Sequence, residues 1–355
     1  MGLQRESVTV LVTAAGTIVA QGIMKCLRLA KEHNPSSEYR IVATDMSPQA
    51  AGLYRADLGL RVPPATSENY LDSLEKICRD EQVRAIFVGS EEELGVLASE
   101  TKRIEDETGT RVLVDSVALA IGSDKLKTFQ FLKENGLPCA ASALPDDESF
   151  VREHGFPLVV KPREGHGSVH FYLAHDRQEL ERFASRIAGA GWRPMLQEHL
   201  PNDEQEFTSG VTVDREGKKV MSSISMRRTL RGGQTFKAFV DDFGTVRASA
   251  EQVALKMKIR GPLNIQARLS GDEPKVFEIN PRFSASAAIR AAAGINEPDI
   301  VFRNWVLGEE ISVASFQKLV CLRYYNEVIV PASAYDQFVR EGRVERGMSS
   351  VTDSF

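Results

Sequence analysis

Apolar residues in the first third of the chain form short runs that alternate with amphipathic stretches. The predicted strands are Val8–Val12, Arg40–Thr44, Arg84–Val88 and Arg111–Val114, which are rich in β-branched residues. The predicted helices cover 18–31, 70–80 and 93–105, where apolar positions recur at helical spacing. This alternation favours a parallel sheet with helices on both faces. We therefore expect a Rossmann-like α/β domain over residues 1–115.

The pattern changes after residue 115 and becomes mostly extended from about residue 158. Ser123 or Asp124 is suited to cap a helix that continues through Glu134 and ends before Pro138. The later predicted strands are 158–161, 195–198, 207–213, 220–226, 263–269 and 277–280, with a closing strand over Val320–Val330. Strands in this proportion predict an α+β arrangement for the C-terminal part of an otherwise α/β protein.

Composition excludes several classes of function. The chain has 355 residues, of which 42% are hydrophobic and 26% charged, as in ordinary globular proteins. A net charge of −5 gives no bulk attraction to nucleic acid or to an anionic membrane. Its four cysteines are scattered without a CxxC pair, and no apolar run approaches the roughly 20 residues of a membrane span. We expect a cytoplasmic protein without nucleic-acid or membrane partners.

Oxygen-bearing side chains gather on two adjacent predicted strands. Glu278 and Asn280 are two positions apart, so they point to the same face of a strand. Gln266 lies on the preceding run, which a turn at 270–274 folds back beside them. Carboxylate and amide oxygens suit a hard cation such as Mg²⁺, and Arg282 is a planar donor suited to a phosphoryl group. The polar face of an exposed hairpin is the competing interpretation.

Two further segments have residues suited to a nucleotide. Lys161 ends a buried strand that runs into a glycine-rich loop at 163–168, where backbone N–H groups can approach phosphate oxygens. A plain hairpin loop with a solvated lysine explains this loop equally well, and the chain contains no GxxxxGK[ST] sequence. The strand 195–198 ends before Pro201, which is typical of a hinge. Glu206 follows, suited to ribose hydroxyls or simply part of an acidic surface loop.

Taken in order, these segments resemble the ATP-grasp superfamily, in its carbamoyl-phosphate-synthase-like branch, over about residues 5 to 310. The segments 261–266 and 278–282 look like the metal motif of that family almost residue for residue. The resemblance implies two lobes that clamp ATP, a small lobe at 116–195 with a glycine-rich lid and a large lobe at 196–355. The residues that it implies for nucleotide binding are Lys125, Lys161, Gly165, Gly167, Ser168, Glu198, Leu200 and Glu206.

The resemblance also implies a reaction. Members of this family phosphorylate a carboxylate with ATP, and an amine then attacks the acyl phosphate. Two Mg²⁺ ions, or Mn²⁺ in their place, would be held by Gln266, Glu278 and Asn280. Arg282 would act on the transferred phosphoryl group, while Arg228 and then Arg231 would act from a mobile arginine-and-glycine loop. The expected partners are a small carboxylate, an amine and, in a homodimer, a second copy.

Five more polar residues are candidates for the substrate pocket. Ser284, Ser286 and Arg290 follow the metal motif, although helix packing explains that segment equally well. Glu91 and Glu93 follow a predicted strand at the edge where open α/β sheets bind ligands, and either is suited to a substrate ammonium. Acidic residues are also favoured in the first turn of a helix for electrostatic reasons alone.

Three other functions compete with the ligase. A nicotinamide-dependent oxidoreductase fits the strand Val8–Val12, Gly16 and Asp45, but Gly16 and Gly22 do not form the GxGxxG fingerprint. Within the resemblance, the acid and nucleophile are alternatively bicarbonate and ammonia, giving carbamoyl phosphate. A pseudo-enzyme that only senses nucleotide is the third alternative.

Overall fold

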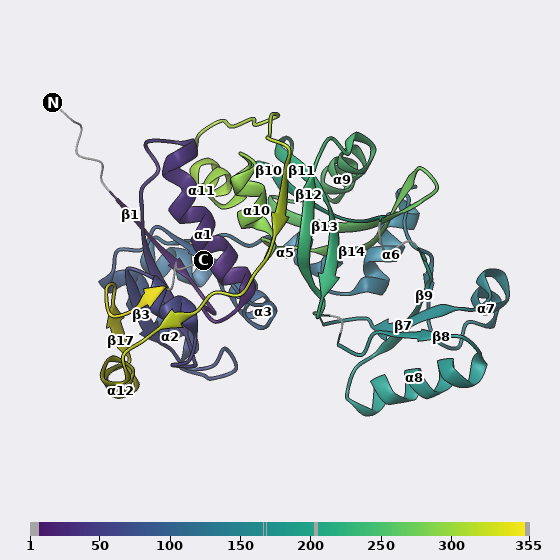
Figure 1. Ribbon diagram of the computed structural model, residues 1–355, viewed down its shortest axis with the longest axis horizontal. Helices are drawn as coiled ribbons and strands as arrows, with labels where there is room; N and C mark the ends of the chain where they lie inside the picture. Colours follow the sequence, from purple (N-terminus) through teal and green to yellow (C-terminus); the bar gives the residue numbers. More distant parts are fainter. Residues whose placement is uncertain (1–6, 166, 168, 202–204, 352–355) are drawn as a thin grey trace.

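The computed structural model of the protein describes residues 7–165, 167, 169–201 and 205–351. Within them the strands form two six-stranded sheets, one four-stranded sheet and one two-stranded sheet. Figure 1 shows the N-terminal sheet on the left, the four-stranded sheet at the lower right and the second six-stranded sheet between them. The expected fold class is confirmed, with a parallel α/β part followed by two antiparallel sheets.

The first sheet has the strand order β17–β3–β2–β1–β4–β5. Its parallel strands are β1 (Val8–Val12), β2 (Tyr39–Asp45), β3 (Leu58–Arg61), β4 (Ala85–Phe87) and β5 (Arg111–Val112). Val10 and Val12 face one hydrophobic cluster, whereas Leu11 between them faces another. The sheet is therefore buried on both faces, as a parallel sheet covered by helices requires.

Helices cover the two faces of this sheet. Residues of α1 (Ile18–His33) and of the 3-10 helix η1 (Ala51–Arg55) belong to the cluster on one face. Residues of α2 (Tyr70–Asp80), α3 (Glu91–Ser99) and α4 (Thr101–Thr108) belong to the cluster on the other. The single helix predicted at 93–105 is wrong, because the chain leaves helical geometry at Glu100 (φ −103°, ψ 8°) and forms two helices instead.

Two helices and a small sheet follow. Asp124 caps α6 (Lys125–Glu134) as predicted, accepting hydrogen bonds from the N–H groups of Leu126 and Lys127, and α5 (Ser116–Gly122) precedes it. The four-stranded sheet has the order β6–β9–β7–β8. Its strands are β6 (Ser142–Ala143), β7 (Leu158–Pro162), β8 (Tyr172–Ala174) and β9 (Pro194–Glu198). Two helices lie between them in the sequence, α7 (Glu148–His154) before β7 and α8 (Arg177–Gly189) before β9.

The second six-stranded sheet is antiparallel, in the order β14–β13–β10–β11–β12–β15. Its strands are β10 (Glu206–Val213), β11 (Val220–Arg231), β12 (Gln234–Val240), β13 (Gly261–Ser270), β14 (Glu273–Asn280) and β15 (Leu319–Leu322). The helix α9 (Gly244–Met257) packs on it through Val253 and Ala254. The helices α10 (Ala287–Ala292) and α11 (Glu297–Leu307) join the cluster shared with α1.

The predicted closing strand over Val320–Val330 is wrong. That segment forms β15, which ends at Leu322, and then the separate strand β16 (Val328–Ile329), which pairs with β18 (Ser350–Val351). Between β16 and β18, α12 (Ala332–Glu341) leads to β17 (Arg343–Glu345), which pairs antiparallel with β3. The C-terminal segment thus completes the first sheet.

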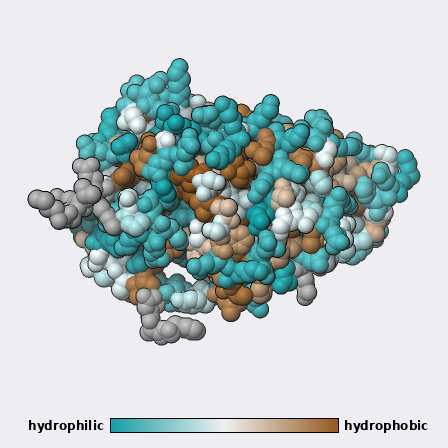
Figure 2. Space-filling model, turned by 90° about the horizontal axis from the view of Figure 1, so that it is seen from above, coloured by the Kyte–Doolittle hydropathy of each residue, from teal (hydrophilic) through white to brown (hydrophobic). Residues whose placement is uncertain are grey.

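The surface is mostly hydrophilic. Figure 2 shows hydrophilic residues over most of one face, with hydrophobic groups gathered near its middle. Among the described residues, no helix is both long and apolar enough to cross a bilayer.

Candidate functional site

A cleft opens between the four-stranded sheet and the second six-stranded sheet. One wall comes from β7 and β9, and the other from β10, β11, β13 and β14. The lining residues include Lys125, Lys161, Gly165, Gly167, Glu198, Leu200, Glu206, Arg228, Gln266, Arg268, Phe277 and Glu278. Nine of the residues expected from the sequence for nucleotide or metal therefore line one cleft together with Arg228.

The three oxygen-bearing side chains lie on paired strands as predicted. Gln266 of β13 is directly opposite Glu278 of β14, and Asn264 is opposite Asn280. The Nδ2 of Asn280 donates to Oε1 of Glu278 over 3.3 Å. Burial alone raises the pKa of the Glu278 carboxyl, but the charges of Lys125, Lys161 and Arg228 outweigh it and hold that pKa below its ordinary value. The cleft thus contains a partly buried, ionised carboxylate.

Arg228 lies within β11, and the expectation that it belongs to a mobile loop is wrong. Its Nη2 donates to Oε1 of Glu206 over 2.8 Å and to Oε1 of Gln266 over 2.7 Å. The other carboxylate oxygen of Glu206 accepts two hydrogen bonds from Arg268, at 2.7 and 3.1 Å. Because Arg228 and Glu206 are both buried, their charges need these partners. Arg228 thus hydrogen-bonds both to Glu206, the expected ribose ligand, and to Gln266, an expected metal ligand.

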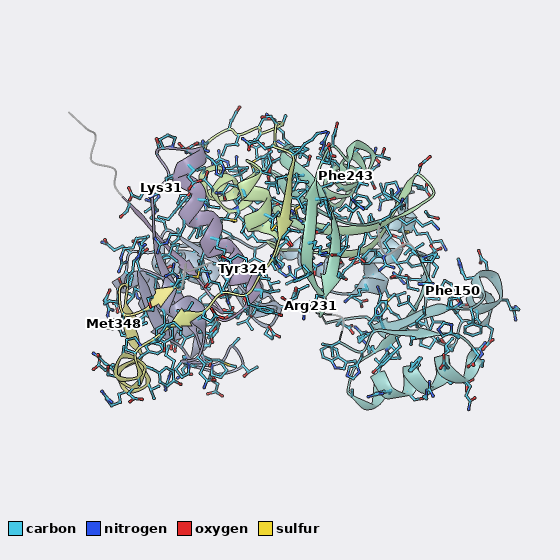
Figure 3. The ribbon with its side chains drawn as sticks, viewed as in Figure 1. Lys31, Phe150, Arg231, Phe243, Tyr324 and Met348 are labelled. Atoms are coloured by element: carbon cyan, nitrogen blue, oxygen red, sulfur yellow. The ribbon has the colours of Figure 1, made fainter. Side chains whose placement is uncertain are left out.

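The glycines next to Arg231 form a tight hairpin. Arg231 pairs with Gln234, leaving Gly232 and Gly233 as the two turn residues. Their φ values of 59° and 73° are both positive, as a two-residue type I′ turn requires. The exposed guanidinium of Arg231 lies 5.3 Å from the ring centroid of Phe236. Figure 3 shows Arg231 at the lower end of this hairpin, in the space between the two ends of the molecule.

Two lysines face the cleft from the small sheet and from α6. Lys161 is only 5% exposed, and its Nζ donates to Oε1 of Gln197 over 2.8 Å. Burial lowers the pKa of Lys161 to about 7, because desolvation disfavours its charged form. Lys125 donates to the carbonyl of Gly165 over 2.7 Å, at the start of the glycine-rich loop. Gly167 also lines the cleft, whereas Ser168 lies outside the described residues.

The expected hinge residues have partners of their own. The Oε1 of Glu198 accepts from the backbone N–H of Ala141 at 2.8 Å and from Nζ of Lys275 at 3.0 Å. The carbonyl of Leu200 accepts from Nη1 of Arg268 at 2.7 Å. The Glu198 side chain therefore ties β9 to β14, while the chain from Glu198 to Leu200 follows the cleft wall.

The first sheet reaches the metal-motif segment through one ion pair. The Nε of Arg282 donates to Oε1 of Glu91 over 2.5 Å, and its Nη2 donates to Oδ1 of Asn280 over 3.2 Å. Glu93 does not face this junction, which corrects its expected role as an ammonium ligand. Its buried carboxyl accepts from the hydroxyls of Thr13 and Tyr70, and burial raises its pKa.

Three expected pocket residues lie behind the site. Arg290 is completely buried, forms an ion pair with Glu297 at 3.1 Å and donates to Oδ1 of Asn264 over 2.7 Å. Ser284 and Ser286 are also buried, and the Ser286 hydroxyl donates to Thr235 over 3.1 Å. None of the three lines the cleft. The expectation that they contact the acceptor is therefore wrong, because each is enclosed by packing and internal hydrogen bonds.

Sequence reasoning missed several cleft residues. Arg268 is two positions after Gln266 on the same strand, so both side chains point to the same face of the sheet. The alternation of side chains along a strand, which predicted a shared face for Glu278 and Asn280, could have predicted this position of Arg268 as well. The contact between Gln197 and Lys161 depends on the pairing of β7 with β9, so no feature of the local sequence predicts it. Phe277 places an aromatic ring 5.8 Å from Nζ of Lys161, a relationship that also required the tertiary structure.

The donor set fits a hard cation with phosphate ligands. Within the described part of the chain, no three His, Cys, Asp or Glu side chains form a metal cluster. One ionised carboxylate and two amides instead present oxygen atoms from paired strands, as Mg²⁺ requires. Gln266 and Asn280 each direct their oxygen toward an arginine as well, so the expected ligands are already oriented.

The comparisons with known families match two separate segments. Residues 10–113 match the family described as "PylC-like, N-terminal domain", and residues 193–328 match "ATP-grasp in the biosynthetic pathway with Ter operon". The second segment is an ATP-grasp domain. The second match includes Glu198, Glu206, Arg228 and the expected metal ligands.

The proteins that this chain resembles differ in length and name. The chain is 26% identical over 200 residues to the carbamoyl phosphate synthase large chain of Vibrio cholerae, covering 52% of the chain but 18% of that relative. Among solved structures, N5-carboxyaminoimidazole synthetase from Staphylococcus aureus complexed with ADP has a TM-score of 0.66 at 17% identity, covering 98% and 92% of the two chains. Biotin carboxylase from Campylobacter jejuni has a TM-score of 0.67 at 17% identity, covering 88% and 74%. These structures show a shared fold.

Proposed function

We propose that this protein is an ATP-dependent ligase that joins a small-molecule carboxylate to an amine. One observation carries the proposal: Gln266 and Glu278 face the same cleft as the buried Lys161, between two sheets that can close on a nucleotide. The ATP-grasp family assignment and the likeness to carbamoyl phosphate synthase large chains support it.

The proposed reaction has two steps. A carboxylate oxygen of the substrate attacks the terminal phosphorus of ATP, and the bond to the bridging oxygen breaks to release ADP. The amine nitrogen then attacks the carbonyl carbon of the acyl phosphate, inorganic phosphate leaves, and the nitrogen loses a proton to solvent. Both steps spread negative charge over phosphate oxygens, so the protein accelerates them mainly by positioning and by fixed positive charge.

The residues of the cleft divide this work. Lys161 and Lys125 would hold nucleotide phosphates, with Gly165 and Gly167 giving the backbone close access to them. Gln266, Glu278 and Asn280 would hold two Mg²⁺ ions, which supply charge neutralisation at the terminal phosphates. Glu206 would accept from the ribose hydroxyls, held in place by Arg228 and Arg268.

Arginines would complete the site at the transferred group. Arg282 would contact the phosphoryl group from beside Asn280, in an orientation that Glu91 fixes. Arg231 would approach from the tip of the exposed hairpin. Arg228 would act from a fixed strand position, so its effect would extend to nucleotide binding through Glu206.

Bicarbonate is the second candidate acid, with ammonia as nucleophile and carbamoyl phosphate as product. The similarity to carbamoyl phosphate synthase large chains favours this alternative. It begins at the same nucleotide site, but ammonia displaces phosphate from the carboxy phosphate to give carbamate, and a second ATP must then phosphorylate the carbamate. A release of two ADP per product that depends on bicarbonate and ammonia therefore separates it from the first candidate.

The test is a screen for phosphate release with ATP, Mg²⁺ and mixtures of carboxylates, bicarbonate and amines. The carboxylate that stimulates release is then supplied with ¹⁸O in its carboxyl group, and we expect one ¹⁸O atom in the released phosphate. Glu278→Gln should lose the stimulated activity, whereas Lys127→Met, at an exposed position on α6, should retain it. Tight nucleotide binding without acid-dependent ADP release would instead identify a nucleotide sensor.

A further inference from the structure

A second cavity shares no lining residue with the nucleotide cleft. It has a volume of about 840 Å³. Its walls come from α1, from η1, from Ala288 of α10 and from the C-terminal segments at 326–328 and 346–351. Figure 3 labels Lys31 near one end of α1 and Met348 in the C-terminal segment. Segments from both ends of the chain therefore build this cavity.

Positive charge is concentrated around this cavity. Its lining contains five cations and one anion, namely Lys25, Arg28, Lys31, Arg55, Arg346 and Glu327. The whole chain has a net charge of −5, so the local excess runs against the overall balance. A cluster with this excess of positive charge attracts anions by Coulomb interaction.

Part of this charge has no partner in the described part of the chain. Asp57 pairs with Arg28 at 2.8 Å and with Arg346 at 3.1 Å. Asp57 therefore partly neutralises the charges of Arg28 and Arg346. Lys25 and Arg55 form no ion pair or hydrogen bond with any described residue. The site thus has donors for an additional anion.

Much of the remaining lining is apolar. Met24 and Tyr54 are buried, and Leu29, Ala288 and Val328 are partly buried around the same space. The Tyr54 hydroxyl already donates to the carbonyl of Pro48 at 2.7 Å, so Tyr54 contributes apolar surface to the wall and not a hydrogen-bond donor. An apolar wall beside a basic rim matches a molecule with a hydrophobic body and an anionic group.

We propose that this cavity binds an organic anion that combines an aliphatic or aromatic body with a carboxylate, sulfonate or phosphate. The body contacts Met24, Tyr54 and Val328, and the anionic group lies among Lys25, Arg28 and Arg55. The site is separate from the nucleotide cleft, so both ligands bind at the same time. The proposal does not depend on the ligase reaction.

The ligand would also connect segments that lie far apart in the sequence. One wall belongs to α1, which begins just after the loop at Gly16, and another to α10, which follows the segment of Ser284 and Ser286. The third wall, at 326–328, follows Arg323, whose guanidinium donates to the carbonyls of Thr235 and Ala285. A bound anion would therefore hold the first sheet, α10 and the C-terminal segment together.

The probe for this site is 8-anilinonaphthalene-1-sulfonate, titrated by fluorescence against the full chain with saturating ADP and Mg²⁺ in the nucleotide cleft. We expect saturable binding that weakens as salt is added, because the rim charges are exposed. The double variant Lys25→Gln with Arg55→Gln should weaken it about 5- to 30-fold, as expected for the loss of two exposed charge interactions. The matched variant Lys102→Gln with Arg152→Gln, at exposed positions of α4 and α7, should bind as the natural protein does.

Two further measurements complete the test. Ala288→Met should reduce binding by filling the cavity, with the thermal unfolding midpoint of each variant measured to check that it is folded. The uncharged N-phenyl-1-naphthylamine should bind at least 5-fold more weakly than the sulfonate. Equal affinity of the sulfonate for the rim variant and the matched control, or equal affinity of the charged and uncharged probes, would overturn the proposal.

Discussion

Glu91 and Arg282 are joined by an ion pair of 2.5 Å although 191 positions separate them in the chain. Glu91 begins α3 on the first sheet, whereas Arg282 follows the last residue of β14. The Glu91 carboxylate, on the first sheet, thereby orients the Arg282 guanidinium next to β14. We expect this guanidinium to contact a phosphate of the nucleotide.

This ion pair should contribute modestly to stability. Both side chains are partly exposed, at 27% for Glu91 and 13% for Arg282. We expect a coupling free energy of about 1 kcal/mol in a double-mutant cycle of Glu91→Gln and Arg282→Gln, above the median for exposed pairs. Chemical denaturation of the two single variants and the double variant measures it. Strictly additive effects would show that the two side chains are not coupled in solution.

Glu278 should make nucleotide affinity depend on magnesium. With Mg²⁺, Glu278→Gln should weaken ATP binding at least about tenfold, because the only carboxylate of the donor set loses its charge. With chelator instead of Mg²⁺, the variant should bind ATP at least as tightly as the natural protein, since a repulsive charge is removed. Calorimetric titration under both conditions measures this reversal. Glu273→Gln, on the exposed end of β14, is the control and should change neither affinity.

Lys161 should make the ligand-free protein more stable as pH rises. Its pKa is lowered to about 7, while an unfolded chain keeps a lysine near 10.5. Between these values the unfolded chain binds more protons, so the free energy of unfolding increases with pH. Lys161→Met removes this titration and should stabilise the protein most at pH 7 and below, by up to about 5 kcal/mol. The gain in the free energy of unfolding of Lys161→Met should decrease toward pH 10.

Urea denaturation from pH 6 to pH 10, without nucleotide, measures the effect of Lys161→Met. Lys127→Met, at an exposed position of the neighbouring helix, should show no such pH dependence relative to the natural protein. A stability gain that stays constant across this range would mean that Lys161 is not held at a depressed pKa. The stabilised variant should nevertheless bind ATP poorly, because it lacks the charge that we expect opposite the phosphates.

Arg228 should affect both stability and nucleotide binding. Arg228→Met leaves Glu206 with Arg268 as its remaining guanidinium partner and leaves Gln266 Oε1 without its donor. We expect a loss of about 1–3 kcal/mol in the free energy of unfolding and weaker ATP binding. Arg228→Lys should not restore either property, because a single ammonium cannot reproduce the forked contacts.

The matched control for Arg228 is Arg227→Met on the same strand, where the guanidinium lies 4.7 Å from the ring centroid of Phe239. It should reduce stability by less than the Arg228 variant and leave ATP affinity unchanged. If Arg228→Met binds ATP normally while turnover falls, the arginine acts on the transferred group alone.

Gly210 should tolerate no side chain. A Cβ at this position of β10 would lie 1.5 Å from Oε1 of Glu297 and 2.4 Å from Nη1 of Arg290. Gly210→Ala must therefore displace a buried ion pair, and we expect a loss of more than about 3 kcal/mol. Gly95→Ala is the control, because nothing lies within 4 Å of its Cβ and α3 should gain about 0.5–1 kcal/mol. Thermal unfolding of both variants gives the comparison.

The sequence was sufficient for features that depend on local periodicity. The spacing of Glu278 and Asn280 and the turn before β14 determined which residues face each other, and Gln266 is opposite Glu278 as expected. The strand that contains Lys161 and the cap at Asp124 were likewise predictable from nearby residues. These patterns operate over about one turn or hairpin, where backbone geometry alone sets the neighbours.

Features that depend on distant pairing were not predictable. The antiparallel pairing of β10 with β11 brings Arg228 next to Glu206. Without that pairing, the sequence does not show that Arg228 is a buried strand residue and not part of a mobile loop. Arg290 follows the metal motif closely in sequence, yet its partner Glu297 and the small residue Gly210 enclose it in the core. A charged residue with a buried partner has the same local sequence pattern as one that faces a ligand.

The return of β17 to the first sheet has a consequence for how the chain can be divided. Without Arg343–Glu345, the backbone of β3 would become an unprotected edge open to association with other chains. A fragment that stops near residue 115 should therefore aggregate when expressed alone and become soluble when the peptide 331–351 is supplied separately. The first sheet combines strands from residues 8–112 with residues 343–345, so its assembly cannot finish until residue 345 has been synthesised.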